Sequence, residues 1–242
     1  MRVSRIFLPG PLQADSLLEL PEEAAHYVKT VLRLKKGQLL CLFNGMGVEA
    51  EARLLEVSRK HVQLEITQIY QRLIESKLNI HLALGISRGD RMDWSIQKAV
   101  ELGVSQITPL LTERTVVKIH QGRDEQKWQH WFKIIQHAAE QCHRTDLPEL
   151  NAVQTLSDWL KTVDGVRLLL DPDGQQTLAA QMPQDNRLVF LIGPEGGLSA
   201  VEKQDAVSTG FSAIRMGPRI LRTETAVITS LSAAQALWGD FA

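Results

Sequence analysis

Hydrophobic and polar positions alternate along residues 38–70, in three successive runs. In the last run Val62, Leu64 and Ile66 are apolar, and the residues between them are polar. Because successive side chains of a strand point to opposite faces, a period of two predicts strands with one buried face. The pattern therefore predicts a small antiparallel sheet or barrel, preceded by one short helix over residues 21–34.

Residues 71–77 are mixed and polar, and the pattern changes after them. Short, continuously apolar runs now alternate with helical stretches, which is typical of a mainly parallel sheet covered on both faces. The predicted strands cover residues 79–87, 106–112, 166–171, 188–193 and 212–217, and the predicted helices cover residues 90–102, 124–143 and 223–238. We therefore expect two domains, an all-β module over residues 1–73 and an α/β module over residues 74–242.

Composition narrows the class of protein. The chain has 242 residues, of which 44% are hydrophobic and 23% charged, as in a folded globular protein. No stretch approaches the roughly 18 apolar residues of a membrane span, and the first ten residues lack the apolar run of a secretory signal. We expect a cytoplasmic protein without membrane contact.

The number of cysteines and the net charge exclude further classes of protein and of binding site. The two cysteines, Cys41 and Cys142, argue against a disulfide scaffold or a thiolate zinc site. His137 and His143 lie near Cys142 but lack a second pair of ligands, so no metal is predicted. The 27 Lys and Arg residues against 28 Asp and Glu give a net charge of -1. A polyanion is therefore not bound by bulk charge, and nucleic-acid binding requires local patches.

A glycine-rich segment, LIGPEGG at residues 191–197, ends one predicted strand. Ligands of open α/β sheets bind at such strand ends, where glycine exposes the backbone at close range. Ser199 and Glu202 form a capping box, which predicts a helix directly after the turn. Glu195 places a carboxylate at the apex of this turn, where solvation alone would not require one. The segment lacks both the P-loop and the GxGxxG spacing, which argues against nucleotide triphosphates and dinucleotides. A plain strand-to-helix turn is the alternative.

A second connection, MGPRILRTETA at residues 216–226, joins a short predicted strand to the last predicted helix. Arg219, Arg222 and Glu224 lie within it. Three charged residues beside an apolar core are unfavourable unless they are paired or used on a ligand. The alternative to a ligand site is an ion pair between Arg222 and Glu224 that ties down the loop.

Together the two motifs resemble the paired signature of the RsmE family, the 16S ribosomal-RNA uridine-N3 methyltransferases of the SPOUT superfamily. The resemblance extends over the whole chain, including RVSRIF, VLRLKKG and SRGDRMDWSIQKAVELGVSQITPL. It implies a PUA-like RNA-binding β-barrel over residues 1–73 and a SPOUT α/β domain over residues 74–242. The last strands and helix of that domain would form a deep trefoil knot. It also implies S-adenosylmethionine as cofactor and a homodimer with its active site at the subunit interface.

The resemblance assigns site residues by motif. The implied cofactor contacts are apolar or glycine positions, namely Leu170, Ile192, Gly193, Gly196, Gly197, Met216, Gly217, Ile220, Leu221 and Ala226. Uracil N3 carries a proton, and its loss leaves a negative charge that a cation can stabilise. We expect Arg222 to supply that cation, and Glu195 or Glu224 to accept or relay the proton.

RNA binding is expected to rest on electrostatics and on the presentation of an unpaired base. A single exposed Lys or Arg is usual on a protein surface and does not indicate RNA binding. The candidate phosphate contacts are therefore chosen because they cluster in the sequence. These are Arg2, Arg5, Arg33, Lys35, Lys36, Arg88 and Arg91. The expected substrate is 16S rRNA, free or within the small ribosomal subunit. The alternatives are a non-catalytic RNA-binding or ribosome assembly factor on this fold, and the same activity on another RNA or base.

Overall fold

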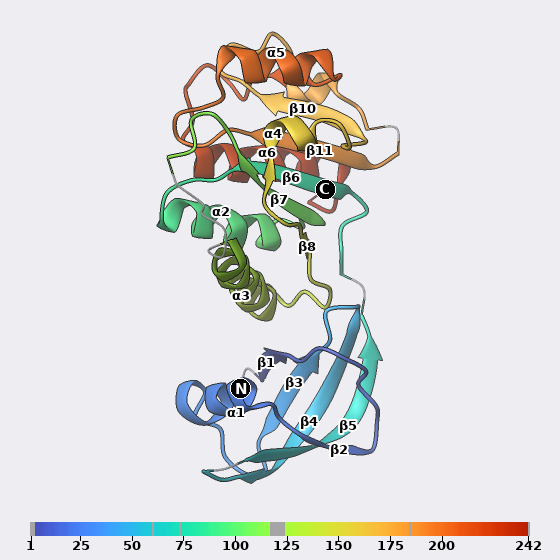
Figure 1. The fold of residues 1–242 in the computed structure, drawn as a ribbon. Coiled ribbons are helices and arrows are strands. Elements are labelled where there is room, and N and C mark those ends of the chain that lie inside the picture. Colours follow the sequence, from blue (N-terminus) through green and yellow to red (C-terminus); the bar gives the residue numbers. More distant parts are fainter. Residues whose placement is uncertain (1–2, 60, 73, 117–123, 184, 242) are drawn as a thin grey trace. The chain divides into compact units, whose positions relative to one another are not determined.

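The computed structural model describes residues 3–59, 61–72, 74–116, 124–183 and 185–241 (Figure 1). These residues form two compact units. The first comprises Met1–Glu75 with Ala139–Leu147, and the second comprises Ser76–Ala138 with Pro148–Ala242. The pattern change after residue 73 lies close to the first junction, whereas no local pattern indicates that residues 139–147 belong to the first unit.

The first unit is built on a five-stranded sheet, in the order β1-β3-β4-β5-β2. Its strands are β1 (Ser4–Phe7), β2 (Ser16–Glu19), β3 (Leu39–Phe43), β4 (Val48–Val57) and β5 (Val62–Gln71). The helix α1 (Glu22–His26) continues into a π-helical turn, Tyr27–Val31, so the helix is shorter than the one predicted over residues 21–34. β3, β4 and β5 pair antiparallel as predicted, but β1 runs parallel to β3. The sheet is therefore mixed, and its two edge strands were not predicted.

The predicted apolar face of β5 is buried in the core of this unit. Val62, Leu64 and Ile66 each have 0% exposed surface. They pack against apolar side chains of β3 and β4, and Ala25 and Val28 of the helical segment join the same cluster. The period of two thus determines which face of β5 turns inward.

The second unit contains a sheet in the order β12-β10-β11-β6-β7-β8, with β9 paired to β7. Its strands are β6 (Asn79–Gly85), β7 (Gln106–Leu111), β8 (Glu149–Leu150), β9 (Gln154–Thr155), β10 (Val166–Leu170), β11 (Arg187–Ile192) and β12 (Ser212–Ile214). Its helices are α2 (Asp90–Glu101), α3 (Asp124–Cys142), α4 (Leu156–Trp159), α5 (Ala200–Ser208) and α6 (Thr223–Trp238), with a 3-10 turn at Leu178–Ala180. Every pairing among these described strands is parallel, which confirms the α/β prediction.

Gly85 determines how closely the loop after β11 approaches the sheet. It is the last residue of β6, the neighbour of β11. A Cβ atom on Gly85 would lie only 2.4 Å from Cδ of Pro194. Glycine therefore allows the loop to lie directly on the end of β6.

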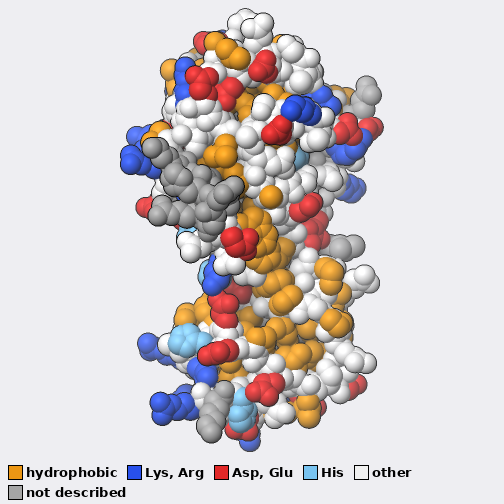
Figure 2. Space-filling view, viewed as in Figure 1, with side chains coloured by type: hydrophobic (Ala, Val, Ile, Leu, Met, Phe, Trp, Pro, Cys, Tyr) orange, Lys and Arg blue, Asp and Glu red, His pale blue; other side chains and the backbone are white. Residues whose placement is uncertain are grey.

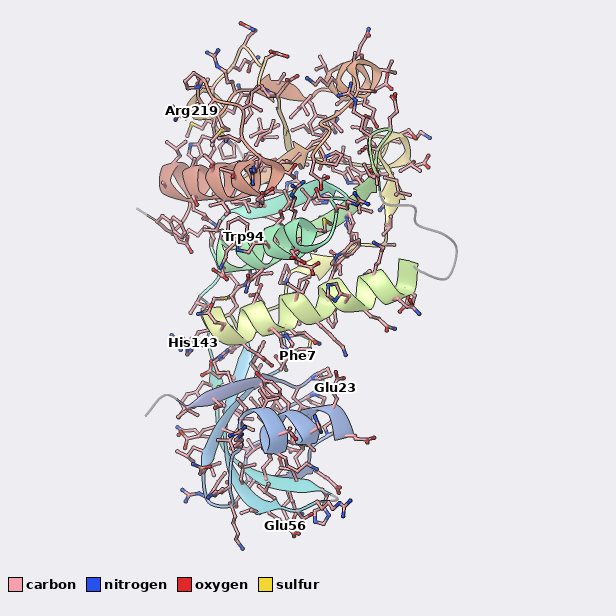
Figure 3. All side chains as sticks on the ribbon, turned by 90° about the vertical axis from the view of Figure 1, so that its left-hand side faces the viewer. Phe7, Glu23, Glu56, Trp94, His143 and Arg219 are labelled. Atoms are coloured by element: carbon pink, nitrogen blue, oxygen red, sulfur yellow. The ribbon has the colours of Figure 1, made fainter. Side chains whose placement is uncertain are left out.

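Helices α2 and α6 pack against each other. The side-chain amide of Gln235, near the end of α6, donates to the carbonyl of Leu102 at 2.9 Å and accepts from the hydroxyl of Ser76 at 2.7 Å. These bonds hold the end of α6 to the end of α2. Trp94 lies on α2 and is 44% exposed (Figure 3).

Arg5 is a buried residue of the first unit. Its side chain is 4% exposed, and Nη1 donates to Oε2 of Glu49 at 2.5 Å. Nη2 donates to the carbonyl of Arg144 at 2.9 Å, and the guanidinium lies 4.9 Å from the ring centre of Phe43. The expectation that Arg5 contacts RNA is therefore wrong, because a phosphate could reach it only by breaking a buried ion pair.

We expect Arg5→Ala to lower the free energy of unfolding by about 3 kcal/mol, because it leaves the Glu49 carboxylate without its cation. Urea denaturation measures this change. Lys36→Ala is the control, since Lys36 is exposed, and its effect should stay within about 0.5 kcal/mol. Equal stability of the two variants would contradict the structural role of Arg5.

Candidate functional site

The two glycine-bearing turns line one cleft, with a volume of about 570 Å³. The first turn follows β11, and the second precedes α6 and carries Arg219 (Figure 3). Every position assigned to the cofactor by motif lines this cleft, namely Leu170, Ile192, Gly193, Gly196, Gly197, Met216, Gly217, Ile220, Leu221 and Ala226. Glu195, Arg222 and Glu224 line it as well. The fold thus brings together residues from β10, β11 and the start of α6.

The first turn is a compact backbone structure. A Cβ atom on Gly193 would lie 3.0 Å from the carbonyl carbon of Gly197, so the two ends of the turn are in close contact. Gly197 has a φ of 68°, which favours glycine, and its N–H donates to the carbonyl of Pro194 at 2.8 Å. Ser199 and Glu202 make both hydrogen bonds of a capping box, which confirms the predicted start of α5.

The second turn is tied to the first by a side chain. The hydroxyl of Thr223, the first residue of α6, donates to the carbonyl of Gly193 at 3.2 Å. Thr223 is only 7% exposed. Gly217 has a φ of 80°, and an added Cβ atom would meet nothing within 4 Å. The main chain of this turn is therefore open to the cleft.

Glu195 is an ionised carboxylate with fixed partners. Its Oε1 accepts from the backbone N–H of Arg88 at 2.9 Å and from Nη1 of Arg91 at 3.1 Å. Partial burial raises the pKa of Glu195, but these hydrogen bonds and the charge of Arg91 outweigh it, so the pKa lies below its usual range. Arg88 and Arg91, both proposed RNA contacts, are exposed at the start of α2. The carboxylate thus holds that segment against the first turn.

Glu224 has a different environment. The residue is 9% exposed, and its Oε2 is buried without a hydrogen-bond partner. Arg222 is exposed, and within the described residues no ion pair joins it to Glu224. The alternative in which these two residues merely pair to hold the loop is therefore not supported. A buried carboxylate oxygen without a donor at the wall of a cleft is suited to accept a proton.

Sequence reasoning missed three cations of the cleft, namely Arg114, Lys203 and Arg215. Arg114, just after β7, donates from Nη1 to the carbonyl of Gly196 at 2.8 Å. Lys203 of α5 forms an ion pair of 2.8 Å with Asp171, the residue after β10. The strand-end rule that located both turns also applies to Arg114, since it follows a strand of the same sheet.

Comparisons with known proteins identify the family. A family model described as an RNA methyltransferase domain matches residues 74–235, and an RNA methyltransferase PUA domain matches residues 20–67. The ribosomal RNA small subunit methyltransferase E of Buchnera aphidicola subsp. Schizaphis graminum is 36% identical, over 99% of this chain and 98% of that protein. The chain belongs to the RsmE family. The ribosomal RNA small subunit methyltransferase E of Bacillus subtilis is 30% identical to this chain, over 87% of this chain and 86% of that protein.

Solved structures agree with this assignment. A Legionella pneumophila protein described as a methyltransferase, in complex with the bound cofactor SAM, has a TM-score of 0.97 and 42% sequence identity. The ribosomal RNA small subunit methyltransferase E of Neisseria gonorrhoeae, bound to S-adenosyl methionine, has a TM-score of 0.93 and 34% identity. Each alignment covers 100% of both chains. The resemblance stated from the sequence motifs is therefore confirmed.

The basic residues of the first unit that were predicted to contact RNA differ in their exposure to solvent. Arg33, Lys35 and Lys36 are exposed directly after the π-helical turn. Figure 2 shows Lys and Arg side chains projecting from this unit on the side of α1. Arg5 is buried, as described above, and Arg2 lies outside the described residues. The exposed cluster of Arg33, Lys35 and Lys36 stays a proposed RNA contact.

Other kinds of site find little support. The described residues contain no group of three or more His, Cys, Asp or Glu side chains that could hold a metal ion. None of the described helices is both long and apolar enough to cross a membrane. Burial raises the pKa of the Cys41 thiol to about 12, so it stays protonated and is a poor nucleophile.

We expect Arg91→Ala to raise the pKa of Glu195, because the variant loses a hydrogen bond and a charge that favour the ionised carboxylate. Carbon-13 NMR titration of the glutamate carboxylates measures this pKa, and Glu195→Gln assigns the resonance. Arg219→Ala is the control, since Arg219 lines the same cleft and is not one of the hydrogen-bond partners of Glu195 among the described residues. An unchanged pKa in Arg91→Ala would show that the Arg91 contact is absent in solution.

Proposed function

We propose that this RsmE-family enzyme transfers the methyl group of S-adenosylmethionine to N3 of a uridine in 16S rRNA of the small ribosomal subunit. The observation that carries the proposal is the single cleft lined by both glycine-bearing turns, with Arg222 and Glu224 at its wall. The names of the curated relatives and the bound methyl donor in two similar structures support it.

The cleft fits this methyl donor. Leu170 and Ile192 supply apolar wall, while the main chain at Gly197 and Gly217 faces open space where a side chain would otherwise stand. Backbone groups can bind the adenine edge and ribose, and apolar walls exclude water from a sulfonium. The residues of both turns would hold the donor, which supplies a methyl group activated by the positive sulfur.

The protein's own groups act on the uracil. N3 must lose its proton before it can attack, and the negative charge then spreads over N3 and the neighbouring carbonyl oxygens. Arg222 stabilises this charge. Glu224 accepts the proton through its unpartnered Oε2. The pKa of Glu195 is lowered because its carboxylate is bonded to Arg88 and Arg91, so this residue orders those two residues beside the cleft.

The remaining expectations belong to the same proposal. The enzyme acts as a homodimer with its active site at the subunit interface, in the cytoplasm, and the end of its α/β domain forms a trefoil knot. Residues 1–73 form the RNA-binding barrel, and residues 74–242 form the methyltransferase domain. The PUA match at residues 20–67 and the full-length similarity to the Neisseria enzyme support this arrangement.

The test is methylation by the purified full-length protein. It is incubated with isotopically labelled S-adenosylmethionine and either unmodified 16S rRNA or small ribosomal subunits, and the nucleosides are analysed by mass spectrometry. We expect 3-methyluridine that carries the label. Binding of donor and RNA without a methylated uridine would instead favour the non-catalytic assembly factor, and a label on another nucleoside would overturn the assignment of the base.

We expect Arg222→Ala to lower kcat about 100-fold while the affinity for S-adenosylmethionine stays unchanged, because Arg222 stabilises charge that exists only in the reaction. Single-turnover kinetics and calorimetry measure the two quantities. Arg222→Lys should recover part of the rate. Arg215→Ala is the matched control, because Arg215 is an exposed cation of the same cleft with no assigned role. A near wild-type rate in Arg222→Ala would refute the role of Arg222.

A further inference from the structure

A second cavity lies at the opposite ends of the strands. Its volume is about 340 Å³, and its walls include Asn79, Gln106 and Arg187. These residues begin β6, β7 and β11, whereas the methyl-donor cleft lies beyond the carboxyl ends of β10 and β11. The two cavities share no lining residue. The second is therefore a separate pocket, which we call the amino-end pocket.

Trp159 supplies an unused donor to this pocket. It lines the cavity and is 2% exposed. Within the described residues its indole N–H has no acceptor, unlike that of Trp128, which donates to the carbonyl of Leu150 at 3.0 Å. The indole nitrogen keeps accessible surface although the residue as a whole is 2% exposed, so its N–H can be reached from the cavity by a ligand or by water.

His81 supplies a second donor. Nδ2 of Asn151 donates to Oγ1 of Thr108 at 2.7 Å, and Oγ1 lies 2.7 Å from Nε2 of His81. Because no other acceptor for the Thr108 hydroxyl is found among the described residues, that hydroxyl donates to Nε2, which places the imidazole proton on Nδ1. Burial lowers the pKa of His81 to about 4, so the ring is neutral at physiological pH. Its Nδ1–H has no acceptor in the described part of the chain.

Amide groups complete the hydrogen-bonding surface. Asn151 uses its amide nitrogen on Thr108, which leaves its carbonyl oxygen as an acceptor, and Gln154 lines the pocket without a side-chain bond among the described residues. Arg187 is already paired, to Asp164 at 2.9 Å and to Asp185 at 3.3 Å. No unpaired cation is therefore present among the described lining residues to hold a phosphate.

We propose that the amino-end pocket binds a neutral nucleobase. A nucleobase presents acceptors beside donors on one planar edge, which matches the N–H groups of Trp159 and His81 and the carbonyl oxygen of Asn151. The cavity lies within the usual range for small ligands, about 300–1,000 Å³. The base comes either from the RNA substrate or from a free nucleoside. The first source rests on the proposed function, because an RNA-modifying enzyme meets unpaired bases along its substrate.

The indole N–H resonances of the full-length protein test this proposal directly. The nitrogen-15-labelled protein is titrated with uridine, cytidine, adenosine and guanosine, and separately with single-stranded oligoribonucleotides. We expect the Trp159 resonance, assigned with Trp159→Phe, to shift downfield as it gains an acceptor, while that of Trp128 stays unchanged. A shift with oligoribonucleotides alone assigns the base to RNA, and a shift with free nucleosides assigns the nucleobase itself. If neither set of probes shifts the Trp159 resonance, the proposal is overturned.

Matched variants separate binding from folding. Trp159→Phe keeps the ring and removes the N–H, so we expect about two- to tenfold weaker binding of the active probe, as for one lost hydrogen bond. Trp128→Phe removes an indole N–H outside the pocket and should leave the affinity unchanged. Equal affinities of the two variants would refute the proposal. Affinity for S-adenosylmethionine and rRNA methylation are measured in parallel, so a failure of the proposed function is seen independently of this pocket.

Discussion

The cleft depends on the close contact of main chain at the ends of β6 and β11. Gly85 leaves no side chain between β6 and Pro194, and Gly193 lies against Gly197 within the turn itself. The hydroxyl of Thr223 then bonds the carbonyl of Gly193, which joins the start of α6 to the same point. Because Gly85, Gly193 and Gly197 let segments of the chain approach without intervening side chains, the shape of the site depends on glycine more than on any large side chain.

Charge is distributed unevenly on a nearly neutral chain. The net charge is -1, yet Arg91, Arg114, Arg219 and Arg222 all line the cleft. Glu195 forms an ion pair with Arg91 and its pKa is lowered, whereas Glu224 is buried without a donor on Oε2. Two carboxylates of one cleft thus have different environments, which suits the ordering role proposed for Glu195 and the proton-accepting role proposed for Glu224.

Local patterns predicted much of this fold. The alternation in β5 and the short, continuously apolar strands of the parallel sheet involve neighbouring residues, so the local pattern reveals them. β1 has four residues, too few for a period, and its pairing with β3 joins Arg5 to Cys41. The burial of Arg5 depends likewise on Glu49, which is distant in sequence, so its pattern resembled that of any surface arginine.

In the candidate site, too, the features marked by local sequence signals were predicted, and those made by contacts distant in sequence were not. Both turns were found because glycine, a strand end and a capping box are local signals, and the resemblance then assigned their roles. Arg114 also follows a strand end, but its bond to the carbonyl of Gly196 joins segments from different strands, which no local pattern reveals. The amino-end pocket was also missed, since Trp159, His81 and Asn151 meet only in the folded sheet.

The division of the chain constrains the order in which the protein can form during synthesis. Residues 139–147 belong to the first unit, and the carbonyl of Arg144 accepts a hydrogen bond from Arg5. The N-terminal module therefore lacks part of its own interior until about half of the α/β module has been translated. A cut at residue 75 would leave the first unit without residues 139–147, which would remain attached to the second unit.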